Sequence, residues 1–445
     1  MALDTYDAAL AYLFSATDYE KMRRVRYNAD TFSLDRMRRL LRAVGSPEER
    51  LAAVHVAGTK GKGSTAAMVH ALALAAGLRS GLYTSPHLVD IRERIRVGSE
   101  MIAPEALRRL IDAARPHVES LRADGDPLTF FEIFTALALR HFADVAVDVV
   151  VVEVGLGGRL DATNVLTPDV AVLTAVSIDH THQLGDSLAA IAAEKAGIVK
   201  PGVPVVCQAQ PPEALEVIEA TCRRREAPLV LLGRDVTVDW QPEWRGGRPG
   251  GRLAVHTPGA DYEDLSLPLM GEHQAANAAA ALAAAQRASP LSPRLTPDLA
   301  REAFASLDWP GRMEYVPGKP EVVLDGAHNR ASMACLVAGL HRHFPGRPPV
   351  FVFAAAADKD IDGMLEVLAD SGAHGVVFTR THNPRAADPA DLAARFAARG
   401  GAGAPVCPDA AAALREATRR AGPDGLVVVC GSLYLVGEVK GLAAT

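Results

Sequence analysis

The chain has 445 residues, a formal net charge of −6 and 49% hydrophobic residues. This length leaves room for about two or three domains. The acidic balance argues against a nucleic-acid binder, and there is neither a signal-peptide pattern nor an apolar run long enough to span a bilayer. The five cysteines never show Cys-x-x-Cys spacing, which disfavours a zinc cluster or a disulfide framework. We therefore expect a cytoplasmic protein that binds neither nucleic acid nor membrane.

Apolar runs alternate with helical patterns along most of the chain, which predicts an α/β fold with a mainly parallel sheet. In the first part, strands are expected at residues 51–57, 81–83, 147–154, 170–176, 203–208 and 229–232. Glycines, tryptophans and short alternating pieces predict a small antiparallel addition at 236–269. An alanine-rich helix over 275–287 follows, and then a segment rich in Pro and Ser, 288–297, which is the best linker candidate.

The alternation starts again after this segment. Strands are expected at residues 321–325, 350–354, 375–378 and 425–430. We therefore predict two α/β domains, residues 1–297 and residues 298–445.

The segment from His55 to Thr65 reads His-Val-Ala-Gly-Thr-Lys-Gly-Lys-Gly-Ser-Thr and leads into a predicted helix over 64–76. A strand, a glycine loop and a helix in this order form a phosphate cradle, because backbone N–H groups and the helix N-terminus face an anion. Lys62 would bring positive charge to the outer phosphates, and Ser64 a hydroxyl to Mg²⁺. The spacing differs from the common Walker A motif, so an ordinary glycine-rich turn is the alternative.

A second candidate is Glu153, the last residue of a strongly apolar strand and the start of a glycine-rich run. In open α/β sheets the ligand lies beyond the carboxyl ends of the strands, so this acid is well placed to hold Mg²⁺. The alternative is an acid that merely caps a turn.

Three further segments leave two interpretations each. Asp179 and His180 follow a strand, where they would either bind a metal or phosphate or make structural hydrogen bonds. Lys195, in a nearly apolar helix, is either an ordinary surface lysine or a desolvated one. The Phe pair in residues 129–132 would stack on a flat heterocycle or simply bury a helix.

Taken together, twelve short strings in order resemble the folylpolyglutamate synthase/dihydrofolate synthase family of Mur-type ATP-dependent ligases. They are residues 58–65, 83–88, 92–95, 129–132, 153–164, 179–181, 194–198, 271–273 with Asn277, 310–314, 325–329, 384–386 and 431–434. The resemblance spans nearly the whole chain. It implies a phosphate-loop ATPase domain of the Mur ligase central type, followed by a Rossmann-like C-terminal ligase domain.

The resemblance also implies an activity. A folate-type carboxylate would be activated by ATP as an acyl phosphate and captured by L-glutamate, with both dihydropteroate and tetrahydrofolate as acceptors. The alternatives are a folylpolyglutamate synthase only, another Mur-type amino-acid ligase, or a nucleotide-binding switch without ligation. We expect a monomer that uses ATP and two Mg²⁺ ions.

The resemblance assigns roles residue by residue. ATP would be bound by Gly61, Lys62, Gly63, Ser64, Asn277, Arg312 and Asp325. The metal would be held by Ser85, Glu153 and His180. Lys195 would be carbamylated, which turns a cation into an anion that supports the second metal. The folate-type substrate would contact Thr129, Phe130, Phe131, Glu132, Leu160, Asp161 and Ala162, and His328 and Arg385 are further candidates.

Three features depart from the family pattern. Lys60 stands where many bacterial members have Asn, although Lys also occurs there. Arg330 replaces the proline that usually follows the Asp-Gly-Ala-His-Asn string, so this loop would be set differently. Residues 236–269 match no motif of the family.

Overall fold

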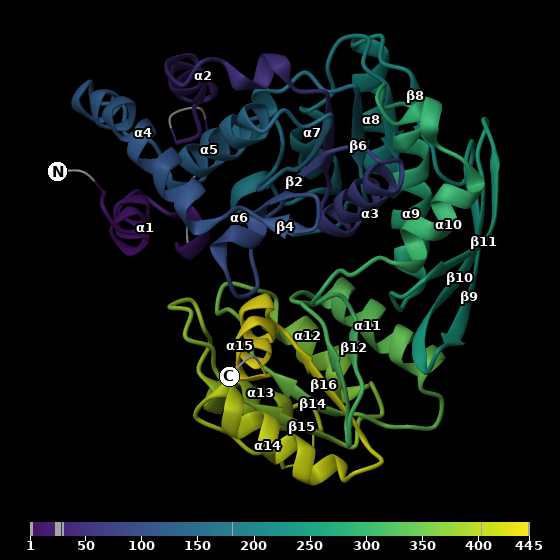
Figure 1. Cartoon of the computed structure of the whole chain (residues 1–445). Helices are drawn as coiled ribbons and strands as arrows, with labels where there is room; N and C mark the ends of the chain where they lie inside the picture. The colour runs from purple at the N-terminus through teal and green to yellow at the C-terminus, as the bar shows by residue number, and fades with distance from the viewer. Residues whose placement is uncertain (1–2, 23–27, 29–30, 180, 402, 444–445) are drawn as a thin grey trace.

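The structure is a computed structural model that describes residues 3–22, 28, 31–179, 181–401 and 403–443. An eight-stranded sheet forms the first region, in the order β4-β3-β2-β5-β1-β6-β7-β8 (Figure 1). Its strands are β1 (Ala53–Ala57), β2 (Ser80–Tyr83), β3 (Ile95–Val97), β4 (Glu100–Met101), β5 (Val149–Glu153), β6 (Val170–Leu173), β7 (Val205–Cys207) and β8 (Leu229–Leu231). Only β3 pairs antiparallel with its neighbours β2 and β4.

Helices cover both faces of this sheet, which is why β1, β5 and β6 are buried throughout. Successive residues of a strand point to opposite faces, so Val54 and Val56 face one core and Ala53 another. The first face is covered by α3 (Lys62–Ala75), α9 (Glu272–Ala285) and α10 (Pro297–Ala305). The second is covered by α1 (Tyr6–Phe14), α2 (Leu34–Ala43), α4 (Pro104–Ala123), α5 (Phe130–Asp144), α7 (Leu188–Ala196) and α8 (Pro212–Arg224).

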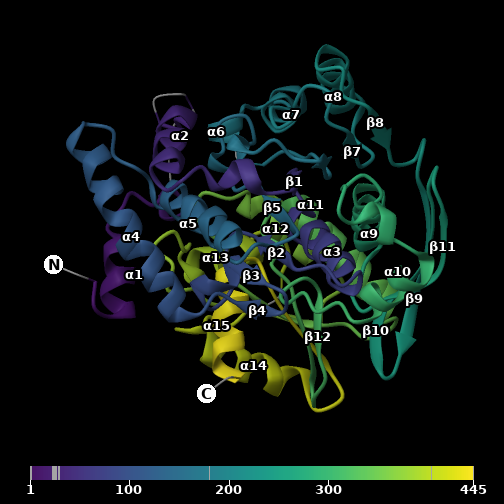
Figure 2. The same cartoon turned by 45° about the horizontal axis from the view of Figure 1, so that its top comes forward.

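The expected antiparallel addition is confirmed as a three-stranded sheet in the order β11-β10-β9. Its strands are β9 (Thr237–Arg245), β10 (Arg248–His256) and β11 (Asp261–Leu267). It lies at one edge of the molecule in both views (Figures 1 and 2) and contacts α9 and α10. The alanines of α9 other than Ala276 are buried because this helix lies between the two sheets.

A five-stranded sheet forms the second region, in the order β12-β13-β16-β14-β15. Its strands are β12 (Glu314–Val316), β13 (Glu321–Leu324), β14 (Val350–Phe353), β15 (Gly375–Phe378) and β16 (Leu426–Cys430), and only β12 is antiparallel. One face packs on α11 (Arg330–His343), α12 (Ile361–Ala369) and α13 (Pro389–Ala397), the other on α14 (Ala410–Ala421) and α15 (Leu433–Ala443). The four strands expected here are therefore confirmed.

The segment between the two regions is packed into the first one. Ala288 and Leu291 are fully buried in the core that α3 and α9 share, and α10 contacts α3 and β11. The division of the chain at residue 297 stays a prediction. Within the described residues, the structure contains no helix with the length and apolar character of a membrane span.

Candidate active site

A cavity of about 640 Å³ lies between the two sheet regions. Its lining comes from the segments that follow β1, β2, β5 and β6 of the first sheet and β13, β14 and β16 of the second. The carboxyl ends of both parallel sheets thus face one space, the position where open α/β sheets bind their ligands.

Most of the site residues expected from the sequence meet in this cavity. Its lining includes Gly61, Lys62, Gly63, Ser64, Ser85, Thr129, Phe131, Glu132, Glu153, Leu160, Asp161, Ala162, Asn277, Arg312, Asp325, His328 and Arg385. Phe130 lies in the core beside it, and Lys195 lines a neighbouring small cavity. His180 falls outside the described residues.

The phosphate loop presents an uncapped helix N-terminus to the cavity. Helix α3 begins at Lys62, and no side chain of the described residues caps it. Gly61 has φ +86°, and a Cβ built on it would lie 2.3 Å from Asn277 Oδ1. A Cβ on Gly58 would lie 1.8 Å from Thr174 Oγ1. Only glycine fits at these two positions, and the backbone N–H groups of the first turn of α3 remain available to an anion.

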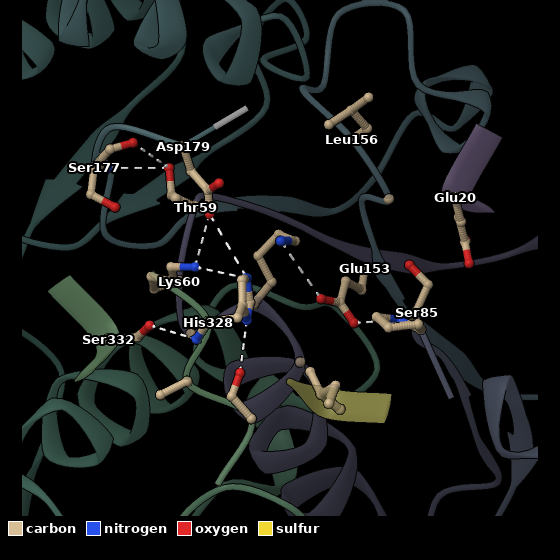
Figure 3. Close-up of a pocket in the computed structure, with 18 of the residues that line it drawn as sticks. Glu20, Thr59, Lys60, Ser85, Glu153, Leu156, Ser177, Asp179, His328 and Ser332 are labelled. Atoms are coloured by element: carbon tan, nitrogen blue, oxygen red, sulfur yellow. Dashed lines mark hydrogen bonds and ion pairs between the residues drawn. The ribbon is translucent and has the colours of Figure 1, made fainter. Parts of the chain in front are cut away.

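Glu153, at the end of β5, lies beside this loop. Its Oε2 accepts a hydrogen bond of 3.1 Å from the Ser85 N–H, and its Oε1 lies 3.8 Å from Lys62 Nζ (Figure 3). Burial raises the pKa of the Glu153 carboxyl, against the lowering effect of the Lys62 charge. Oε2 accepts one hydrogen bond and Oε1 has one long contact, so most of the acceptor capacity of this carboxylate is unused.

These observations test whether the site fits Mg²⁺. In the described part of the chain, no three His, Cys, Asp or Glu side chains gather as a metal site would require. Mg²⁺ retains several waters and takes phosphate oxygens, so one or two protein ligands suffice for it beside a nucleotide. Glu153, a buried oxygen donor with unused acceptor positions, fits that requirement.

Asn277, Arg312 and Asp325 bring the second region and α9 to the same end of the cavity. Asn277 donates to Gln274 Oε1 at 2.9 Å and accepts from Gln208 Nε2 at 2.9 Å. The Asp325 oxygens accept backbone N–H groups of Met313 and Ala327, each at 2.8 Å. Burial raises the pKa of Asp325, and the nearby Arg312 guanidinium opposes this rise.

A polar cluster around Asp179 joins the two regions. Asp179 accepts hydrogen bonds from Lys60 Nζ at 2.9 Å, Lys359 Nζ at 2.8 Å and Asn329 Nδ2 at 3.0 Å. Lys60 Nζ also lies 3.1 Å from His328 Nε2, as Figure 3 shows. The Lys60 charge holds the pKa of His328 well below its usual value, so the imidazole is neutral and accepts this bond. Burial lowers the pKa of Lys60 to about 8.

This cluster contains Lys359, which lies outside the quoted motifs, and Asn329, the last residue of the 325–329 string, to which the resemblance assigns no role. Lys359 and Asn329 lie more than a hundred residues from Asp179 along the chain and come from the other sheet region. The sequence is compatible with a ligand role and with a structural role for Asp179, and the structure shows that its carboxylate contacts the second region directly.

Arg385 makes a further connection between the regions. Its guanidinium pairs with Asp358, and its Nη1 donates to the carbonyl oxygen of Glu20 at 2.8 Å. Glu20 lies in a short turn (Tyr19–Lys21), and its carboxylate accepts two hydrogen bonds from Arg94, at 2.8 and 2.7 Å. The N-terminal turn thus contacts both regions at the cavity wall.

The two phenylalanines of residues 129–132 have different environments. Phe131 lines the cavity and packs against Gly155, where a built Cβ would lie 2.5 Å from the ring. Phe130 is 1% exposed and stacks on Phe134 with ring centroids 5.6 Å apart. Of the two interpretations of the pair, stacking on a ligand is geometrically open to Phe131, whereas Phe130 packs in the core.

Glu132 is buried among its own partners. It accepts hydrogen bonds from Arg36 Nη2 at 2.8 Å and from Arg36 Nε at 3.0 Å. It also accepts from the backbone N–H of Thr129 at 2.7 Å and from the Thr129 hydroxyl at 2.8 Å, closing a capping box at the start of α5. Burial raises the pKa of Glu132, and the Arg36 charge opposes the shift.

Lys195, in α7, is 4% exposed and donates to the carbonyl oxygen of Gly58 at 2.8 Å. It lines a second cavity of about 20 Å³ together with Lys62 and Asp179. Burial, and then the charge of Lys62, lower the pKa of Lys195 to about 7. The lysine is therefore the desolvated one of the two alternatives.

Comparison with known protein families identifies both regions. The Mur ligase middle domain matches residues 56–285, and the Mur ligase glutamate ligase domain matches residues 311–433. The chain belongs to the Mur ligase family. The two matched segments meet at the cavity described above.

Similar proteins of known name identify the subfamily. It is 36% identical to the dihydrofolate synthase/folylpolyglutamate synthase of Bacillus subtilis, over 92% of this chain and 94% of that protein. It is 39% identical over 440 residues to a Haloferax volcanii protein whose name pairs folylpolyglutamate synthase with dihydropteroate synthase. That alignment covers 98% of this chain but spans only half, 50%, of the relative.

A solved structure agrees with these relatives. The fold matches Mycobacterium tuberculosis folylpolyglutamate synthase complexed with ADP, with a TM-score of 0.89 and 34% identity over 98% of this chain and 99% of that one. The chain is thus an ATP-dependent ligase of the folylpolyglutamate synthase/dihydrofolate synthase family. The expected α/β fold, with a Mur-type ATPase region and a C-terminal ligase region, is confirmed.

Proposed function

We propose that the protein joins L-glutamate to folate-type carboxylates, forming ADP and phosphate from ATP, and that it accepts both dihydropteroate and tetrahydrofolates. The observation that carries this proposal is the cavity, which is lined by an uncapped helix N-terminus, the buried acid Glu153 and the ring of Phe131. The names of the relatives support the same chemistry.

The first step would be phosphoryl transfer from ATP to the acceptor carboxylate. Positioning and charge neutralisation account for nearly all catalysis of such a transfer. The N–H groups at the start of α3 would hold the phosphates, and the charges of Lys62 and Arg312 would stabilise the transferred group. Asn277 and Asp325 would complete the nucleotide site from α9 and the second region. Mg²⁺ ions, when bound at Glu153 and Ser85, would neutralise phosphate charge and align the oxygens.

The second step would be attack of the glutamate amine on the acyl phosphate, which releases phosphate and leaves an amide. Water must be kept from the acyl phosphate, and a cavity enclosed by two regions provides that exclusion. His328 and Arg385 line the same cavity and are candidates for substrate contacts. Phe131 would stack on the pterin ring, with Thr129, Leu160 and Ala162 around it.

Lys195 would carry a carbamate. Only a neutral amine adds CO₂, and the burial that lowers its pKa to about 7 favours the neutral form. A carbamate beside Lys62 and Asp179 would convert a buried cation into an oxygen donor for a second metal. A monomer in the cytoplasm remains our expectation.

The proposal is tested by measuring ADP release with dihydropteroate and with tetrahydrofolate, each with and without L-glutamate. We expect release with both acceptors and dependence on glutamate in each case. Activity with tetrahydrofolate and none with dihydropteroate would show that the protein is a folylpolyglutamate synthase only. ADP release that needs neither acceptor nor glutamate would contradict ligation and favour a nucleotide switch.

A further inference from the structure

A buried histidine at the centre of β1 is not used by the chemistry above. His55 is 0% exposed in a strand whose other residues are apolar. Its Nε2 lies 2.8 Å from the hydroxyl oxygen of Thr163, which is also 0% exposed. A buried imidazole loses its hydration, so an apolar residue would be the default at this position.

The hydrogen bond has a defined direction. Thr163 has one hydroxyl proton, and it donates that proton to Asp161 Oδ1. The hydroxyl oxygen must then accept from His55, so Nε2 carries the imidazole proton. Nδ1 has no hydrogen-bond partner within the described residues, and burial lowers the pKa of His55 to about 3, so the ring is neutral. A chain of hydrogen bonds with a single donor direction thus runs from His55 through Thr163 to Asp161.

The chain ends on a carboxylate whose acceptor positions are occupied. Asp161 Oδ1 accepts from the hydroxyl and from the backbone N–H of Thr163, the latter at 2.9 Å. Oδ2 accepts from the Leu156 N–H at 2.9 Å, and the Gly155 N–H also bonds this carboxylate. These bonds close the loop between β5 and the short helix Ala162–Val165. Asp161 therefore holds the loop together, and little acceptor capacity remains for a ligand.

This loop forms one wall of the cavity. Leu156, Leu160 and Ala162 all line it, on the side of Phe131, and β1 leads directly into the phosphate loop. His55 therefore connects the strand that carries the phosphate loop with the wall proposed to contact the acceptor.

We infer that His55 is a positioning residue for acceptor binding, which acts through Thr163 and Asp161 on the cavity wall formed by Leu156, Leu160 and Ala162. The inference rests on the proposed function, because it assigns this wall to the folate-type acceptor. It predicts that loss of this chain of hydrogen bonds weakens acceptor binding, while ATP binding at the phosphate loop is unchanged.

A matched pair of substitutions at Thr163 provides the test. Thr163→Val keeps the shape and removes the hydroxyl, whereas Thr163→Ser keeps the hydroxyl. One hydrogen bond to a charged group corresponds to about a tenfold change in an equilibrium constant or more. We therefore expect Thr163→Val to raise the acceptor KM, and the Kd from a fluorescence titration with dihydropteroate, by about tenfold. The ATP KM and kcat should stay within about twofold, and Thr163→Ser should resemble the wild type.

His55 gives a second, independent pair, which decides the matter if Thr163→Val does not fold. His55→Leu removes the donor and should raise the acceptor KM as Thr163→Val does, whereas His55→Gln offers an amide N–H and should restore much of the affinity. Because the residues form one chain, His55→Leu combined with Thr163→Val should be no worse than the more severe single variant.

Three results would overturn the inference. One is an unchanged acceptor KM and Kd in Thr163→Val and His55→Leu. Another is a parallel rise of the ATP and acceptor KM values with a lower unfolding midpoint, which would show a purely structural role. The third is a wild type that does not bind dihydropteroate. A wild type that binds dihydropteroate but shows no glutamate-dependent ADP release would contradict the proposed function alone, because the titration does not depend on turnover.

Discussion

Glu153 and Glu132, two buried acids that line the cavity, have different surroundings. Glu153 has one N–H donor, from Ser85, and an ammonium group 3.8 Å away, as far as the described residues extend. Glu132 accepts four hydrogen bonds or more from Arg36 and Thr129. A carboxylate with unused acceptor positions can take a cation, whereas one satisfied by its own chain shapes the site without reacting. Burial alone does not distinguish these two roles.

The largest effect on activity is expected at the phosphate loop. Lys62→Ala removes the charge at the start of α3 and should reduce kcat by about 1,000-fold without unfolding the protein, because Lys62 lies at the cavity and not in a core. Lys319→Ala, in an exposed loop, is the control and should keep normal turnover. Near-normal ADP release by the Lys62 variant would contradict the assignment of this loop to phosphate binding.

Glu153→Gln tests the unused acceptor positions directly. The amide keeps the shape but loses the charge, so activity should fall by about 100-fold or the Mg²⁺ requirement should rise steeply. The measurement is ADP release over a Mg²⁺ titration. An unchanged Mg²⁺ dependence would show that Glu153 has a structural role, as Glu132 does.

Glu132→Gln is the matching change at the second buried acid. It removes the negative charge that lies 2.8 Å from the buried Arg36 guanidinium, 7% exposed, which then keeps the Asp126 carboxylate at 3.5 Å. The free energy of unfolding should fall by about 3 kcal/mol. The Mg²⁺ dependence should be that of the wild type. Asp35→Asn, in the exposed pair with Arg38, should change stability by less than about 0.5 kcal/mol. A Glu132 variant that is fully stable but needs more Mg²⁺ would reverse the comparison.

The smallest expected effect is a pH-dependent modification of one side chain, the carbamate on Lys195. With its pKa lowered to about 7, the amine is neutral above that pH and protonated below it, so carbamate formation should increase as the pH rises through 7. Electron density or intact mass in bicarbonate should show the added CO₂, and Lys195→Arg should show none. An unmodified ammonium in a fully active enzyme at pH 8 would refute the carbamate.

The sequence predicted the fold where apolar runs are long enough to be buried on both faces, as in β5 and β16. It missed β3, β4 and β12, which are two or three residues long and carry mixed residues. The phosphate loop and Glu153 could be found because each lies within one local motif. The Asp179 cluster could not, since Lys359 and Asn329 reach it only after the two regions assemble.

The same limit applies to Glu132 and Asp161. The resemblance assigns Glu132 and Asp161 to substrate binding, and both do lie at the cavity. A motif does not record how many donors a carboxylate already has, so direct contact and positioning look alike in sequence. Arg36, which bonds Glu132, lies outside the quoted motifs. His55, which reaches Asp161 through Thr163, is the first residue of the phosphate-loop segment.

The central claim is that this cavity joins glutamate to a folate-type carboxylate with ATP. The most direct measurement is the mass of the acceptor after incubation with ATP, Mg²⁺ and L-glutamate, together with the amount of ADP formed. The account predicts an acceptor heavier by one glutamyl residue for each ADP released, with dihydropteroate and with tetrahydrofolate. ADP formed without any change in acceptor mass would contradict it.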